Sequence, residues 1–328
     1  MSHASNHPTI TLDGFSLDEA FEIFLDFDRT WSVIPHGCHH EIEAAWNRIQ
    51  NAANVAGITT LKVALDRLPA LLRNFTYDGA ALSRFADAAT SAKVHQHRNL
   101  FTAVTLASAA NFGADLEPVY KATDLALHPR TTAVNRPCEL DEIILLRTHA
   151  ILLTERDDAD QLKTAGILAL SDAGLLVKET TEITRTDFID VDDDLKPAAV
   201  VALGNSVTTD RLVMLDPFAQ HISAAVINGR PAKGALLYTP RKDENLPGSA
   251  KAQASATGVI TTAFKHVGLH YADLAPGSVR AWRIAHTWEH VSGDAACEIS
   301  GMNETRTERL AHRQRPLATP VTASVTRF

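Results

Sequence analysis

Side chains that commonly bind metal ions gather in two short stretches of the sequence. His286, Glu289 and His290 follow the pattern His-x-x-Glu-His, which places two imidazoles four residues apart, where they could hold zinc on one face of a helix. A third ligand would have to come from the chain beyond them, from Glu298 or Glu304. The alternative, which we favour, is a helix with two partly exposed histidines. This stretch therefore predicts no metal cofactor.

The second stretch, residues 36–41, reads His-Gly-Cys-His-His-Glu. It has no second cluster at the spacing of a zinc finger, so we interpret it as the approach to a helix with Glu41 in the first turn. Asp192, Asp193 and Asp194 are three successive carboxylates. Such a run is more typical of a solvated acidic turn than of a metal site, and no metal site is predicted there.

A third pattern is the Asp-x-Asp-x-Thr motif of Asp26, Asp28 and Thr30, which matches the signature of haloacid dehalogenase-type phosphotransferases. In those enzymes the first aspartate is a nucleophile that follows a buried strand. Here Ser16 and Glu19 form a capping box ahead of the motif, and a capping box predicts a helix. We therefore expect no phosphotransfer chemistry from these residues.

Arginines near the C-terminus are candidates for phosphate contacts, because the guanidinium fork suits phosphate oxygens. Arg280 and Arg283 lie three residues apart and could share one helix face. Further along the chain come Arg306, Arg309, Arg313 and Arg315. For Arg280 the alternative is a structural ion pair, and for the later arginines it is a solvated terminus. The sequence leaves both alternatives open.

The elements that would position these residues differ between the two halves of the chain. Apolar residues at three- and four-residue spacing predict helices over 17–26, 41–55, 61–73, 79–89 and 99–110. We expect a polar tail over residues 1–12 and a helical domain over 13–111. Scattered glycines and prolines then predict a linker over 112–138.

Residues 139–312 combine helices with a small sheet, and residues 313–328 form a basic tail. Helices are predicted over 140–146, 159–172, 217–227, 259–267 and 279–291, and short strands over 198–203 and 211–215. The segment 242–257 is rich in Gly, Ser, Ala and Lys, and we expect a mobile loop there. The fold class is therefore mainly α with a small antiparallel β-sheet (α+β).

The composition limits the functions that these elements can have. The chain of 328 residues has 31 basic and 39 acidic residues, a formal net charge of −8, so any DNA-facing surface must be a local patch. No stretch approaches the length of a membrane span. The three cysteines, Cys38, Cys138 and Cys297, are odd in number and far apart, which argues against a disulfide framework and for a cytoplasmic location.

Several stretches of the second half resemble, in order, motifs of the tyrosine recombinase (phage integrase) family. Residues 173–188, Ala-Gly-Leu-Leu-Val-Lys-Glu onward, resemble the first motif, usually Gly-Leu-Arg-Ile-Ser-Glu-Leu. Residues 211–216 and 236–240 resemble the segments after the β-hairpin lysine and before the final helices. Residues 275–282 resemble the second motif, usually Pro-His-x-Leu-Arg-His; 299–303 resemble Leu-Gly-His; and 305–310 resemble the stretch that ends in the nucleophilic tyrosine.

The resemblance covers about residues 139–312, and it implies a core-binding-like helical domain ahead of a recombinase-like catalytic domain. In this family a tyrosine attacks a DNA phosphate, two arginines stabilise the developing charge, and a lysine and histidines assist proton transfer. Only one of these residues is retained here, Arg280 of the second motif. The others fall on Leu176 (first arginine), Ser206 or Thr209 (hairpin lysine), Gly277 and Met302 (histidines) and Leu310 (tyrosine).

The missing nucleophile does not depend on the alignment. The four tyrosines are Tyr77, Tyr120, Tyr238 and Tyr271, and all precede the second motif. We therefore expect a protein that binds duplex DNA through Arg280, Arg283, Arg211, Arg306 and Arg309 but does not cut it alone. Its role would lie in DNA recombination, integration or mobile-element regulation, with self-association or an active recombinase as partner, and with no cofactor and no membrane.

Two other functions stay open at this stage. The acidic charge and the missing hairpin lysine also suit a protein-interaction adaptor that no longer binds DNA. The metal and phosphate patterns leave, as a third hypothesis, an unrelated metal- or phosphate-dependent enzyme. A basic cleft that contains Arg280 and Arg283 would favour DNA binding, and an acidic or neutral cleft would favour the adaptor.

Overall fold

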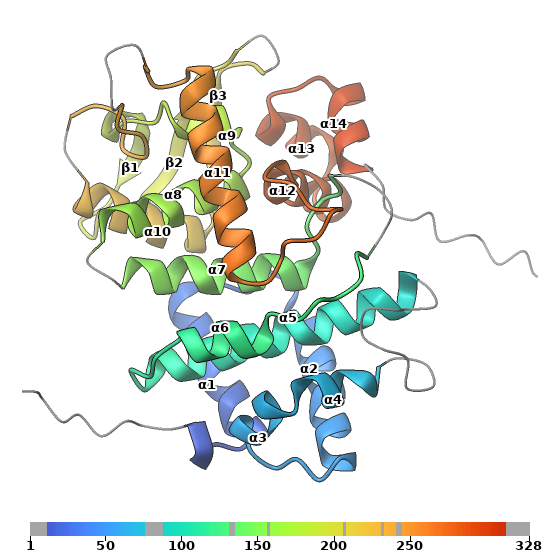
Figure 1. Ribbon diagram of the computed structural model, residues 1–328. Coiled ribbons are helices and arrows are strands. Elements are labelled where there is room, and N and C mark those ends of the chain that lie inside the picture. The colour runs from blue at the N-terminus through green and yellow to red at the C-terminus, as the bar shows by residue number, and fades with distance from the viewer. Residues whose placement is uncertain are drawn as a thin grey trace, which may run out of the picture.

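The computed structural model describes residues 12–75, 88–130, 135–155, 158–205, 208–230, 233–240 and 245–312. Two lobes are stacked on one another (Figure 1). The N-terminal lobe, residues 12–130, carries α1 to α6, and the C-terminal lobe, residues 135–312, carries α7 to α14 and the sheet. The predicted class, mainly α with a small antiparallel sheet, is confirmed.

Helices of the N-terminal lobe begin where local capping favours them. The capping box of Ser16 and Glu19 opens α1 (Leu17–Trp31), as the sequence predicts. The remaining elements are the 3-10 turn η1 (Leu12–Gly14), α2 (His39–Val55), α3 (Leu61–Asp66), α4 (Leu68–Arg73), α5 (Ala88–Asn111) and α6 (Glu117–Thr123). Residues 61–73 form two helices instead of one, because Pro69 lacks an N–H and fits only in the first turn of a new helix.

Two other predictions for this lobe are the helix over 79–89 and the linker over 112–138. Most of the helix predicted over 79–89 lies outside the described residues. The predicted linker contains the short helix α6, which the weak periodicity of 112–138 did not indicate. Pro118 stands in its first turn, so the proline that was interpreted as a linker signal is a helix-start signal here. The domain boundaries as a whole stay a prediction.

In the C-terminal lobe the helices cover one face of the sheet. They are α7 (Leu140–Thr154), α8 (Ala159–Ala173), α9 (Val177–Thr180), α10 (Pro217–Gly229), α11 (Ala250–His266), α12 (Gly277–His290), α13 (Gly293–Ser300) and α14 (Glu304–Ala311), with the 3-10 turn η2 (Arg185–Asp187). The mobile loop predicted over 242–257 is wrong from residue 250 onward. Ser249 caps the N-terminus of α11, and the alanines that follow have the highest intrinsic helix propensity.

The sheet is a three-stranded antiparallel meander in the order β1 (Phe188–Val191), β2 (Pro197–Ala202), β3 (Arg211–Met214). Phe188, Val200 and Val213 pair across it and are buried against the helices. The opposite face carries Leu212 and Met214, which are 53% and 66% exposed. Asp192–Asp194 belong to the turn between β1 and β2, as predicted, although the sequence did not indicate β1 itself.

The two lobes meet where α5 lies against α7 (Figure 1). One continuous cluster of buried apolar side chains runs through both lobes. Charged side chains are also buried at this junction: Arg130 of the N-terminal lobe pairs with Asp141 and, at 3.2 Å, with Glu142 of α7. Asn99 of α5 donates to Asp141 of α7 at 2.7 Å. These contacts hold the lobes in one arrangement.

Candidate functional site

A cavity of about 590 Å³ opens where α9, α11, α12 and α14 approach one another. We call it the arginine cavity, after the buried Arg280 in its wall. Its lining consists of Asn135, Leu176, Val177, Lys178, Asn205, Gln253, Thr257, Ala275, Pro276, Gly277, Arg280, Ala281 and Leu310. Six separate parts of the sequence, from Asn135 to Leu310, therefore meet here.

Arg280 is buried, with 7% of its surface exposed. Its Nε donates to the Gly174 carbonyl at 2.8 Å, and its Nη2 donates to the Ser300 carbonyl at 2.7 Å. Among the described residues no carboxylate forms an ion pair with it, although ion pairs hold other buried arginines. The guanidinium is thus fixed in place by neutral carbonyls, and its charge is not neutralised by a direct partner.

The neighbouring Arg211, in contrast, has a direct carboxylate partner. It donates to both carboxylate oxygens of Glu179 at 2.8 Å and to the Ile299 carbonyl at 2.8 Å. Burial and then the charge of Arg211 lower the pKa of Arg280, Glu179 opposes these effects, and the result is a pKa of about 10. Arg211 and Arg280 thus have one carboxylate nearby, that of Glu179, and it binds only Arg211 directly. A net positive charge remains beside the arginine cavity.

Glu179 is the residue that sequence reasoning missed. Burial by itself would raise the pKa of its carboxyl, but the hydrogen bonds and the charge of Arg211 outweigh burial and lower it. Its Oε1 also accepts from the Thr208 hydroxyl at 2.9 Å, and its Oε2 accepts from the Leu176 amide at 2.7 Å. The signal in the sequence was its place as the third residue of α9 after the N-cap Leu176.

The positions that the resemblance singled out lie together. Leu176, Gly277, Arg280 and Leu310 all line the arginine cavity. Thr209 and Met302 do not line it but lie behind Arg280: the Thr209 amide donates to the Gly301 carbonyl at 2.9 Å, and the Met302 amide donates to the Ser300 hydroxyl at 3.0 Å. Ser206 lies outside the described residues.

The other arginines predicted to contact DNA have different surroundings. Arg211 is used in the ion pair with Glu179. Arg283 lines a different cavity and is bound to Asp216 and to the Asp172 carbonyl. Arg306 and Arg309 are exposed on α14, and Arg313 and Arg315 lie outside the described residues. Arg280 is thus the predicted residue with a buried charge that no carboxylate binds directly.

The described tyrosines are buried elsewhere. Tyr120, Tyr238 and Tyr271 are 6%, 6% and 8% exposed, and none of them lines the arginine cavity. Tyr120 shares a 2.8 Å hydrogen bond with His149, and burial raises the pKa of Tyr271. Tyr77 lies outside the described residues. Within the described chain no tyrosine hydroxyl borders the cavity.

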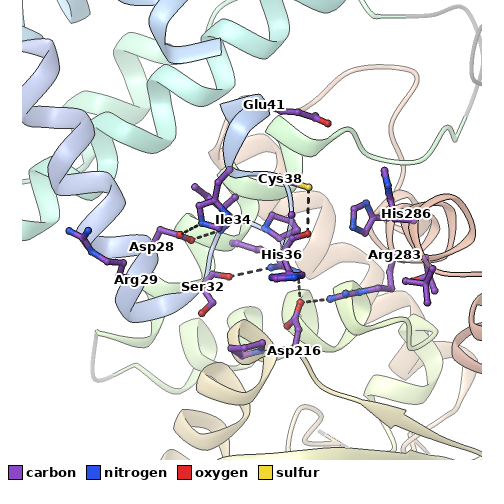
Figure 2. A pocket seen from close by; sticks show the side chains of 18 residues that line it. Asp28, Arg29, Ser32, Ile34, His36, Cys38, Glu41, Asp216, Arg283 and His286 are labelled. Atoms are coloured by element: carbon purple, nitrogen blue, oxygen red, sulfur yellow. Dashed lines mark hydrogen bonds and ion pairs between the residues drawn. The ribbon is translucent and has the colours of Figure 1, made fainter. Parts of the chain in front are cut away.

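A second cavity, of about 650 Å³, lies between the lobes (Figure 2). We call it the junction cavity. Both histidine-rich stretches of the sequence reach it: His36, Cys38 and Glu41 from the N-terminal lobe, and His286 and His290 from α12. The His286 ring stacks on Trp282 at 4.7 Å and lies 4.4 Å from the His290 ring, measured between ring centroids.

The tertiary structure brings these two stretches together, which the sequence did not predict. In the part of the chain that the structure describes, no three histidine, cysteine or carboxylate side chains gather closely enough to hold a metal ion. Asp28 of the phosphotransferase-like pattern lies within α1, where its carboxylate accepts from the Ile34 amide at 2.6 Å and pairs with His39 at 2.9 Å. This carboxylate closes a loop and does not follow a strand.

Ion pairs neutralise the arginines of the junction cavity. Asp216 accepts from Arg283 (Figure 2). Asp216 also accepts from Arg147 at 2.7 Å, and Asp172 accepts from Arg147 at 2.7 Å. Burial would raise the pKa of Asp216, but the charges of Arg147 and Arg283 hold it well below its usual range. Two carboxylates thus serve two arginines here, in contrast to the arginine cavity.

Comparisons with known proteins give structural similarities only. No family model and no curated protein matches the chain. Among solved structures, XerA recombinase aligns at 12% identity and a TM-score of 0.42 over 91% of this chain and 94% of its own. XerH site-specific recombinase bound to its difH substrate aligns at 16% identity and a TM-score of 0.41, over 94% and 96% of the two chains. A Tn1549 transposon integrase in complex with circular-intermediate DNA aligns at 13% identity and a TM-score of 0.38, over 89% of this chain and 94% of its own.

The solved structures that this chain resembles are thus tyrosine recombinases and integrases, the family that the sequence motifs resemble. A search of the helices in the described ranges for a candidate membrane span finds none of sufficient length and hydropathy.

Proposed function

We propose that this protein is a tyrosine recombinase-like DNA-binding protein that does not cleave DNA by itself. The observation that carries the proposal is the environment of Arg280: a buried guanidinium, held by two carbonyls, that lines a cavity and has no direct carboxylate partner among the described residues. A buried charge without a counter-ion is costly, and a phosphate oxygen would supply the missing negative charge.

The absence of cleavage follows from the chemistry of the neighbouring side chains. Leu176 and Leu310 occupy the cavity at the positions equated with the first arginine and the tyrosine. Neither leucine can attack phosphate or stabilise the charge that develops on it. The protein would act in recombination, integration or mobile-element regulation in the cytoplasm, where an active recombinase or a second copy of the chain would supply any cleavage.

The first test is binding to duplex DNA across a salt series. Neutralisation of one phosphate contributes a slope of about −0.9 to the plot of log affinity against log salt. Arg280→Ala is therefore expected to weaken binding and to reduce the steepness of that slope by about one. Arg283→Ala is the matched control, because Arg283 lies on the same helix and is already neutralised by Asp216.

An unchanged slope for Arg280→Ala, in a protein that remains folded by circular dichroism, would contradict a phosphate contact at Arg280. A slope that changes equally in both variants would mean that the effect comes from general surface charge.

The second test concerns cleavage. Incubation with nicked duplexes that trap covalent protein–DNA adducts is expected to give no adduct, even with Leu310→Tyr, because Leu176 still replaces the first arginine. An adduct formed by the unaltered protein alone would refute the proposal that it cannot cleave.

A second candidate function is a protein-interaction adaptor. The observation in its favour is the outer face of the sheet, where Leu212 and Met214 are exposed beside the acidic turn of Asp192–Asp194. No DNA binding at low salt, together with loss of a partner on substitution of Met214 by Asp, would favour this function over DNA binding.

A further inference from the structure

The arginine cavity is larger than a single phosphate group requires. Its volume of about 590 Å³ falls within the range of small-molecule sites, roughly 300 to 1,000 Å³. A phosphate in the backbone of stacked duplex DNA would reach Arg280 at the cavity wall but would leave the rest of the space unfilled. The remaining volume therefore needs its own explanation.

The cavity wall has two chemically different parts. Arg280 and the half-buried Lys178 supply positive charge. Leu176, Pro276 and Leu310 supply apolar surface. Leu176 and Leu310 stand at positions that the resemblance equates with polar catalytic groups, and this part of the wall can accept an apolar body instead.

Polar groups without formal charge complete the lining. Asn205 and Gln253 present amides, and Thr257 presents a hydroxyl. Amides can donate to and accept from the edge of a nucleobase. A few polar groups in a largely apolar cavity are the usual pattern of a site that orients one small planar ligand.

We infer that the arginine cavity binds a single nucleotide unit whose base has left the helical stack, with the phosphate at Arg280 and Lys178 and the base against Leu176 and Leu310. This inference rests on the proposed function for the phosphate contact and adds a base-binding role. The nucleotide unit has two sources, an unpaired nucleotide within DNA or a free nucleoside monophosphate. Unstacking costs least where the base is already unpaired.

The DNA arm of the test uses three duplexes of one sequence: fully paired, with a single-nucleotide bulge of 2-aminopurine, and with an abasic residue at the bulge. The abasic bulge keeps the backbone and its flexibility but removes the base. We expect the 2-aminopurine bulge to bind about tenfold more tightly than the abasic bulge, which corresponds to about 1.4 kcal/mol. Its fluorescence should change on binding.

A cavity-filling variant links the effect to this cavity. Gly277 lines it, and a Cβ built on Gly277 meets no atom within 4 Å, so Gly277→Trp can be accommodated at the backbone and would fill the space. Gly258→Trp is the matched control, since Gly258 is also helical, equally unobstructed and outside the cavity lining. Only Gly277→Trp should abolish the tenfold preference for the 2-aminopurine bulge over the abasic bulge, and Gly258→Trp should retain it.

The second arm titrates the unaltered protein with deoxyadenosine monophosphate and with deoxyadenosine. Binding of the monophosphate without any DNA binding would support the ligand class, assign it to free nucleotides and overturn the proposed DNA function. Equal affinity for all three duplexes, with no monophosphate binding, would overturn the inference and leave the DNA function intact. No binding of any probe would overturn both.

Discussion

At the scale of single residues, the difference between Arg280 and Arg283 decides what each can do. Both are on α12, three residues apart, and both donate to backbone carbonyls near the C-terminal end of α8. Arg283 has Asp216 as a direct partner, whereas Arg280 only shares the field of Glu179 with Arg211. From residue type alone, both arginines were predicted to contact phosphate. The neighbouring carboxylate Asp216 neutralises Arg283 but not Arg280.

Glu179 gives a prediction at the same scale. Glu179→Gln keeps the shape but removes the carboxylate from a buried pair, so the free energy of unfolding should fall by about 3 kcal/mol. Because the pKa of Glu179 is lowered in the folded protein, its contribution is present above its unfolded value, about 4.5, and is lost as the pH falls through its folded value. Urea unfolding at pH 7 and pH 4 measures both effects.

The exposed Glu298→Gln on α13 is the control for Glu179→Gln and should change stability by less than about 0.5 kcal/mol. Equal stability of the two variants would show that the pair of Glu179 with Arg211 adds little to folding.

At the scale of elements, buried charges connect α7 with the chain before it and with the segment before α12. Arg136 lies between Glu142 and Asp273, and all three are at most 3% exposed. Charges from α7 also reach Arg130, so the network extends beyond one pair. Such a network is costly to bury and more costly to leave incomplete. The junction of the lobes therefore depends on polar contacts as well as on the shared apolar core.

Substitution of one arginine of this network should show how much the network contributes to the free energy of unfolding. Arg136→Met leaves Asp273 without its guanidinium partner and Glu142 with Arg130 alone, and the free energy of unfolding should fall by about 3 to 5 kcal/mol. Calorimetry measures this loss. Lys121→Met breaks an exposed pair with Glu117, and this control should cost less than about 1 kcal/mol.

An unchanged free energy of unfolding for Arg136→Met would mean that its pairs with Glu142 and Asp273 add little to folding.

At the scale of the whole molecule, buried histidines link folding to pH. Burial, and then the charge of Arg130, lowers the pKa of His95 to about 3. Burial also lowers the pKa of His97 to about 4. Both histidines are on α5, with 0% and 1% of their surfaces exposed. In the unfolded chain both would take up a proton near pH 6.5, so protonation favours unfolding.

The sign of the effect is therefore fixed. The free energy of unfolding should have its full value above about pH 6.5. It should decline as the pH falls toward the pKa values of the two histidines in the folded protein, with about 2 kcal/mol lost per histidine at pH 5. Denaturant midpoints at pH 8 and pH 5 measure the decline. His95→Gln should show a smaller decline between pH 8 and pH 5 than the unaltered protein. A decline of the same size in His95→Gln would mean that other groups cause it.

The sequence by itself determined much of what local physics controls. The capping box at Ser16, the helical periodicity of α2, α7 and α8, and the strand pair β2 and β3 were all predictable, because each depends on residues close in the chain. It also determined the lack of a tyrosine after Tyr271. It failed at the first half of α11, where composition suggested a loop and the capping residue Ser249 starts a helix, although the helix predicted over 259–267 is confirmed.

Only the tertiary structure decided which distant residues share an environment. Leu176, Gly277, Arg280 and Leu310 meet in one cavity, while Glu179 is bound to Arg211, 32 residues further along the chain. Packing also separated Arg280 from Arg283 into different cavities. The physical reason is that charge neutralisation depends on distances through space, and these depend on how the helices pack, which local periodicity does not encode.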